Sequence, residues 1–161
     1  MTDLKLLSTY LNDHLAGSVV GRELSKRAAG ENRGTPLGSF LEKLHAQIVE
    51  DRQALLDAMD ALDVGEDHVK TVAARIGERV GRLKPNGNLL SYSPLSRVVE
   101  LEGLAVGVHA KGALWASLAQ LDDPRLEGFD FAALERRAHR QREELEAFRL
   151  DSARIAFEES D

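Results

Sequence analysis

The chain has 161 residues and a net charge of −6, and 43% of its residues are hydrophobic. This length favours a single domain, residues 1–161, whose core needs neither disulfides nor a structural metal. The acidic balance argues against nucleic acid and anionic membranes as general partners. The sequence contains no cysteine, which excludes thiol catalysis and iron–sulfur clusters. The N-terminus lacks the basic and apolar runs of a signal peptide, so we expect a cytoplasmic protein.

Hydrophobic periodicity predicts an all-α protein with five helices and no strands. The helices are expected over residues 3–29, 36–62, 66–83, 94–120 and 130–158. Residues that favour the N-cap position precede four of these helices: Asp3, Thr35, Ser93 and Asp130.

Two features of the predicted helices bear on their packing. Gly17 and Gly21 form a small-xxx-small pair in the first helix, and we expect a neighbouring helix to approach closely there. The helix over residues 94–120 is apolar nearly all round, with Lys111 as its one full charge between Gly103 and Leu121. That pattern is typical of the central helix of a soluble bundle.

Short connections between helices favour antiparallel neighbours, so the chain is predicted to form two helical hairpins. Residues 63–93 connect the two hairpins and carry the short helix over residues 66–83. This layout resembles the ferritin-like superfamily of four-helix bundles. The stretch Tyr10-Leu11-Asn12-Asp13-His14-Leu15-Ala16-Gly17 is also similar to helical proteins of actinobacterial type, a resemblance that implies no activity.

The ferritin-like resemblance implies a di-iron motif against which the residues can be compared. Such sites take one Glu from each of two helices and a Glu-x-x-His pair from each of the other two. The chain has one such pair, Glu42 and His45, close to the start of its helix. On the last helix, Glu135 and His139 are spaced by four residues. The di-iron motif is therefore incomplete, and Glu42 and His45 are interpreted as flanking residues of a partly exposed helix.

Reflection of each hairpin about its turn brings polar residues to the middle of the bundle. His14 falls level with Asp51, and we predict a contact that raises the pKa of His14 and lowers that of Asp51. The second hairpin places Lys111 opposite Gln141. The resulting polar core belt consists of His14, Asp51, His109, Lys111 and Gln141.

Three interpretations of the polar core belt stay open. In the first, a buried hydrogen-bonded network fixes the register of the helices. In the second, the belt binds a single divalent metal ion, although Lys111 would place a positive charge beside it. The ligands of that ion would be His14, Asp51, Glu102 and His109, with Glu144 as an alternative to Glu102. In the third, Lys111 and a histidine bind an anionic or carbonyl-bearing small molecule.

The expected function is a non-enzymatic binding or structural module that works without a cofactor. The apolar stripes of the helices over 66–83 and 130–158 exceed what a lone bundle needs, so we expect a homo-oligomer, a dimer, and leave room for an unidentified protein partner. The basic amphipathic helix over 66–83 is more typical of a solvated face than of a membrane-surface contact. The alternative is a metal-binding protein or metalloenzyme with an atypical His/carboxylate site.

Overall fold

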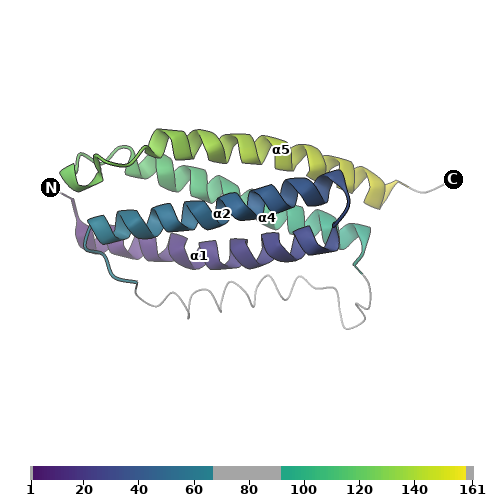
Figure 1. Cartoon of the computed structure of the whole chain (residues 1–161), viewed down its shortest axis with the longest axis horizontal. Helices are drawn as coiled ribbons and strands as arrows, with labels where there is room; N and C mark the ends of the chain where they lie inside the picture. Colours follow the sequence, from purple (N-terminus) through teal and green to yellow (C-terminus); the bar gives the residue numbers. More distant parts are fainter. Residues whose placement is uncertain (1, 67–91, 159–161) are drawn as a thin grey trace.

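A computed structural model describes residues 2–66 and 92–158 of the chain. These residues form four long helices and one short 3-10 helix (Figure 1). The elements are α1 (Leu4–Glu31), α2 (Pro36–Ala61), α4 (Pro94–Leu118), η1 (Pro124–Leu126) and α5 (Phe131–Phe157). The described ranges contain no strand, so the all-α prediction is confirmed. The helix predicted over residues 66–83 lies, beyond Glu66, outside the described residues.

The four long helices begin where the sequence predicts. Each predicted N-cap side chain accepts a hydrogen bond from a backbone N–H of the first turn. Pro36 and Pro94 occupy the first helical position, where the missing N–H has no intrahelical partner to lose. The predicted and observed bounds of these helices differ by at most two residues.

The helices pack in two pairs, α1 with α2 and α4 with α5. In Figure 1 the chain reverses its direction between the members of each pair, and α2 and α4 run the same way. The main contact between the pairs is made by α1 and α4, whereas α2 and α5 touch at few positions. None of the described helices is long and apolar enough to cross a membrane.

The apolar core consists of two clusters that follow each other along the bundle. One contains Leu11, Leu55 and Trp115, and lies at the end where the α4–α5 connection crosses. The other contains Leu41 and Leu145, and lies toward the α1–α2 turn. Trp115 is 1% exposed and is the largest fully buried side chain among the described residues.

The close helix approach predicted at Gly17 and Gly21 is not found among the described residues. No described atom lies within 4 Å of a Cβ built on either glycine, since both lie on a half-exposed part of α1. A close approach occurs instead at Gly112, where a Cβ would lie 3.4 Å from the Cβ of Ala138 on α5. The spacing of small residues in a sequence does not determine at which of them a neighbouring helix packs closely.

The start of α4 is tied to the turn between α1 and α2 by a buried amide. Asn32 donates from Nδ2 to the hydroxyl of Tyr92 at 2.9 Å, and its Oδ1 accepts from Nε of Arg97 at 2.9 Å. The Arg97 guanidinium also lies 5.8 Å from the centre of the Tyr92 ring, within cation–π range. Burial raises the pKa of Tyr92 to about 12, against a smaller opposite effect of the Asn32 hydrogen bond. The turn and the start of α4 are therefore held together as one polar unit.

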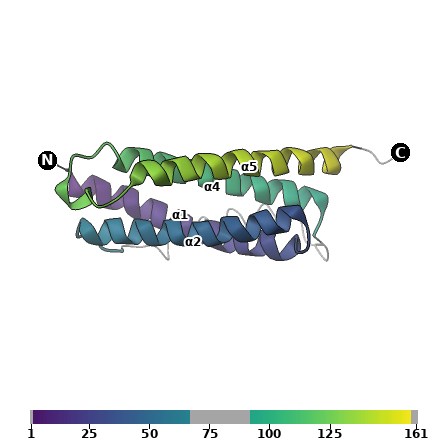
Figure 2. The same cartoon turned by 45° about the horizontal axis from the view of Figure 1, so that its top comes forward.

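The buried face of α5 does not extend through its last turn. Leu145 and Ser152 are buried, but Ile155 is 48% exposed. The Phe148 ring stacks on Phe40 near the start of α2, with ring centres 5.1 Å apart. The end of α5 projects beyond the other helices (Figure 2), so its apolar side chains lack a helix to pack on among the described residues.

Candidate functional site

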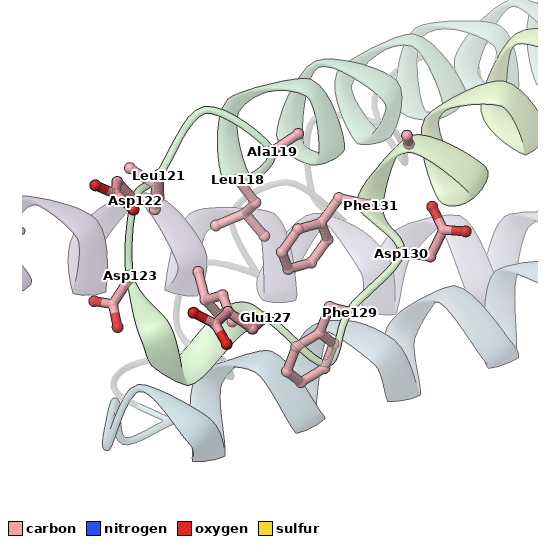
Figure 3. A pocket seen from close by; sticks show the side chains of 11 residues that line it. Leu118, Ala119, Leu121, Asp122, Asp123, Glu127, Phe129, Asp130 and Phe131 are labelled. Carbon is pink, nitrogen blue, oxygen red and sulfur yellow. The ribbon is translucent and has the colours of Figure 1, made fainter.

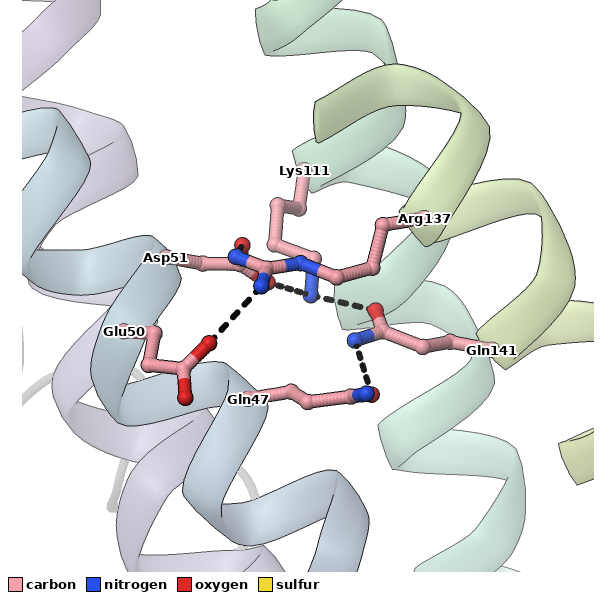
Figure 4. Close-up of polar contacts among 6 residues, drawn as sticks. All are labelled: Gln47, Glu50, Asp51, Lys111, Arg137 and Gln141. Atoms are coloured by element: carbon pink, nitrogen blue, oxygen red, sulfur yellow. Dashed lines mark hydrogen bonds and ion pairs between the residues drawn. The ribbon is translucent and has the colours of Figure 1, made fainter. Parts of the chain in front are cut away.

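The middle of the bundle holds a cluster of charged and amide side chains from three helices, which we call the Asp51 cluster. Its members are Gln47, Glu50 and Asp51 of α2, Lys111 of α4, and Arg137 and Gln141 of α5 (Figure 4). Asp51 follows Ile48 on the buried face of α2, and its side chain is 3% exposed. Helical periodicity therefore turns this carboxylate inward.

Both oxygens of the Asp51 carboxylate are bound by cations. Lys111 donates from Nζ to Oδ2, and Arg137 donates from Nη2 to Oδ1. The two cationic groups come from different helices, so one carboxylate of α2 links α4 and α5. Because α2 and α5 otherwise touch at few positions, these bonds are a principal link between the two helix pairs.

The remaining members bind the two cations and extend the cluster toward solvent. Lys111 Nζ also donates to Gln141 Oε1 at 2.6 Å, and Gln141 Nε2 donates to Gln47 Oε1 at 2.8 Å. Arg137 Nη1 donates to Glu50 Oε2 at 2.8 Å. The Glu50 side chain is 63% exposed and forms the outer edge of the cluster. The cluster is thus a continuous chain of hydrogen bonds from the core to the surface.

The electrostatics of the cluster are those of a buried ion pair. Burial lowers the pKa of Lys111, and the Coulombic attraction and hydrogen bond of Asp51 act in the opposite direction. Removing Asp51 would leave the Lys111 amine without an ion pair among the described residues, which is costly for a largely buried cation. Lys111 lines neither of the two surface pockets described below, and its amine donates to Asp51 and Gln141.

The structure brings together three of the five predicted belt residues. Asp51, Lys111 and Gln141 meet in the Asp51 cluster, and the predicted pairing of Lys111 with Gln141 is a direct hydrogen bond. His109 lies apart on the exposed side of α4, where its Nδ1 is 3.2 Å from Nη1 of Arg142. His14 also lies outside the cluster and packs against Tyr10 on α1.

The predicted pKa shift of His14 is wrong in direction. The His14 ring packs edge-on against Tyr10, with centres 4.6 Å apart, while Asp51 is taken by Lys111 and Arg137. Burial therefore lowers the pKa of His14, and the nearby Asp13 opposes this effect only in part. Hairpin reflection estimates the height of a residue along the bundle, but it does not determine which side of α1 His14 occupies.

Because the pKa of His14 is lowered from 6.5, we expect stability to fall as the solution is acidified. Below its ordinary pKa the unfolded chain takes up a proton at this histidine that the folded chain resists, so folding loses free energy. Urea unfolding at about pH 7.5 and about pH 5.5 should show a larger acid-induced loss for wild type than for His14→Gln. Equal losses in the two proteins would contradict the shift.

The four predicted metal ligands are not brought together. His14, Asp51 and His109 have the separate partners given above, and Glu102 accepts from Arg149 Nη1 at 3.4 Å with its side chain 55% exposed. Within residues 2–66 and 92–158, no group of three or more His, Asp or Glu side chains is placed to hold a metal ion.

The incomplete di-iron motif also finds other partners. Glu42 is exposed, and His45 Nδ1 shares a hydrogen bond with Ser25 Oγ at 3.0 Å. On α5, His139 Nε2 lies 3.5 Å from Glu135 Oε1, an i,i+4 contact on one helix. These histidines are therefore engaged locally rather than directed at a shared centre.

Sequence reasoning missed Arg137 and Gln47 as members of the Asp51 cluster. Arg137 looked like part of the alternating Arg/Glu surface of the last helix, a pattern typical of solvated i,i+4 pairs. A signal was nevertheless present, because Arg137 lies four residues before Gln141 and Gln47 four residues before Asp51. Each therefore shares a helix face with a predicted inward-facing residue.

Two pockets open on the surface of the described residues, away from the Asp51 cluster. The larger, about 290 Å³, lies where the α4–α5 connection crosses the end of the bundle (Figure 3). The smaller, about 150 Å³, lies between α4 and α5 and is lined by His109, His139 and Arg142 among others.

Comparison with known proteins adds no relative to this description. No protein family, curated protein or solved structure matches the chain. The contacts of the described residues therefore carry the functional argument.

Proposed function

We propose that this chain is a non-enzymatic binding or structural module, built on a ferritin-like bundle that lacks a di-iron centre. The observation that carries the proposal is that the Asp51 carboxylate, in the middle of the bundle, is already bound by two cations. Both oxygens of Asp51 are taken by the chain's own cations, Lys111 and Arg137. A metal ion at this place would have to displace one cation and lie beside the other, which is electrostatically unfavourable.

The ferritin-like part of the proposal rests on the order and direction of the helices. Two helix pairs are joined by a connection of residues 62–93, and α2 and α4 run the same way (Figure 1). The end of α2 and the start of α4 therefore lie at opposite ends of the bundle (Figure 1), as the second and third core helices do in ferritin-like proteins. We also propose the cytoplasm as the location, on composition alone, and expect no nucleic-acid partner because the net charge is −6.

Elemental mass spectrometry tests the proposal against its alternative, a metalloprotein using His14, Asp51, Glu102 and His109. Protein purified without a tag or chelator, and then soaked in Fe(II), Mn(II) or Zn(II), is expected to hold far less than one metal ion per chain. The soaked His14→Ala and His109→Ala variants serve as controls. Near-stoichiometric metal in wild type that both variants lose would overturn the proposal.

The exposed end of α5 supports a homo-oligomer as part of this function. Leu150, Ile155 and Phe157, in the last part of α5, are 55%, 48% and 66% exposed. The end of α5 projects beyond the other helices (Figure 2). Apolar side chains gathered on one projecting helix end are typical of protein–protein contacts. We propose that this end pairs with a second copy of the chain.

Light scattering at micromolar concentrations tests the dimer. Wild type is expected at twice the mass of the 17.7 kDa chain, and Leu150→Ser/Phe157→Ser at the monomer mass. Val106→Ser is the matched control, because Val106 is 71% exposed on α4, away from the α5 end. A wild-type protein that stays monomeric across this range would refute the dimer.

A further inference from the structure

The larger pocket has an apolar floor inside a polar rim. Leu118 of α4, Leu126 of η1 and Phe131 of α5 form the floor and are at most 5% exposed. Figure 3 shows the carboxylates of Asp122 and Asp130 at the edge of the pocket. The volume of about 290 Å³ is that of a shallow site for one side chain or a small molecule.

Arg125, the cation beside the pocket, does not neutralise the carboxylates of the pocket rim. Arg125 binds Asp123 through Nη2 and Oδ2 at 2.7 Å, and donates from Nη1 to the backbone oxygen of Leu62 at 3.2 Å. Among the described residues, Asp122 and Glu127 have no ion pair. An apolar floor thus meets exposed carboxylates that have no counter-charge within the described part of the chain.

The acidic surface continues beyond the pocket onto the end of α2. The bond from Arg125 to Leu62 brings that end beside the pocket. Residues 60–66 add the exposed side chains of Asp60, Asp63 and Glu66. In residues 2–5, 60–66 and 119–132, the only cationic side chains are Lys5 and Arg125. The negative charge therefore spans an area larger than a single small amine would cover.

We propose that this pocket binds a Lys or Arg side chain presented by a basic segment of a partner protein. The inference rests on the proposed binding function and names its partner class. The aliphatic stem of the side chain would pack on Leu118 and Phe131 while its charge meets Asp122 and Glu127. The wider acidic surface would steer the basic segment and contact its further charges.

Trp115 provides the readout, because it is the one tryptophan of the chain and stacks on Phe131 with ring centres 6.0 Å apart. The probe is the peptide acetyl-Leu-Lys-Leu-Lys-Leu-amide, titrated against the full chain while Trp115 fluorescence is followed. We expect a saturable change, weakened about tenfold or more in Asp122→Asn/Glu127→Gln. Ala119→Arg, which adds a cation to the lining of the pocket, should weaken binding comparably.

The matched control is Glu143→Gln/Glu144→Gln, which removes the same charge from an exposed part of α5 outside the pocket. It should leave the peptide affinity within about twofold. An equal loss in the control, or none in the rim variant, overturns the proposal. So does n-butylamine that binds as tightly as the peptide, since the site would then serve a free amine.

Metal content measured on the same sample separates this inference from the proposed function. If the protein is metal-free and does not bind the peptide, the proposal for the pocket is refuted and the proposed function is not. Stoichiometric metal in the bundle overturns the proposed function whatever the peptide does.

Discussion

Replacing Asp51 by alanine is expected to lower the free energy of unfolding by about 3–5 kcal/mol, because it removes the carboxylate that pairs with Lys111 and leaves Arg137 with Glu50 alone. The Asp51 carboxylate is 3% exposed, and Lys111 and Arg137 are 14% and 22% exposed. Urea unfolding followed by circular dichroism gives the measurement.

A double-mutant cycle separates the ion pair from simple loss of packing. If the pair is the cause, Asp51→Ala should cost much less in a Lys111→Met background, because one uncompensated charge is already gone. Additive losses would show that Asp51 and Lys111 act independently and would refute this account. Glu50→Gln is the control: its carboxylate binds the same Arg137 but is 63% exposed, so we expect a change within about 0.5 kcal/mol.

The Asp51 cluster also shows how far sequence reasoning reached. Reflection of each helical hairpin about its turn placed Asp51 in the middle of the bundle, where its side chain is buried, and paired Lys111 with Gln141, a contact that is present. Both inferences need only the period of the helix and the position of a turn. The same procedure failed for His14, because height along a helix does not determine which neighbour the side chain faces.

Arg137 was missed for a different reason. Its sequence surroundings are those of a solvated helix surface, yet its long side chain reaches across to Asp51 and Glu50 on α2. The direction of such a side chain depends on the distance between helices, which no periodicity encodes. Caps behave in the opposite way: Asp3, Thr35, Ser93 and Asp130 bind backbone groups within the next turn, so local sequence is sufficient.

The turn between α1 and α2 depends on a glycine that sequence spacing did not single out, and Gly38→Ala is expected to lower the free energy of unfolding by about 3 kcal/mol. A Cβ built on Gly38 would lie 2.1 Å from the backbone oxygen of Asn32 and 2.8 Å from its carbonyl carbon. Backbone atoms cannot rotate away as a flexible side chain can, so the turn itself must shift. Asn32 would move with it, and its bonds to Tyr92 and Arg97 would be strained.

Two measurements distinguish this clash from the ordinary effect of placing alanine in a helix. Gly107→Ala is the matched control: Gly107 is exposed within α4 and no described atom lies within 4 Å of its Cβ position, so we expect a gain of about 0.5–1 kcal/mol. In Gly38→Ala, loosening of the turn should let Tyr92 become more solvated and lower its pKa from about 12, which absorbance near 295 nm follows during alkaline titration. A variant that is as stable as wild type, with the same tyrosine titration, would mean that the turn can widen freely. The Asn32 bonds would then not hold the start of α4 against the first helix pair.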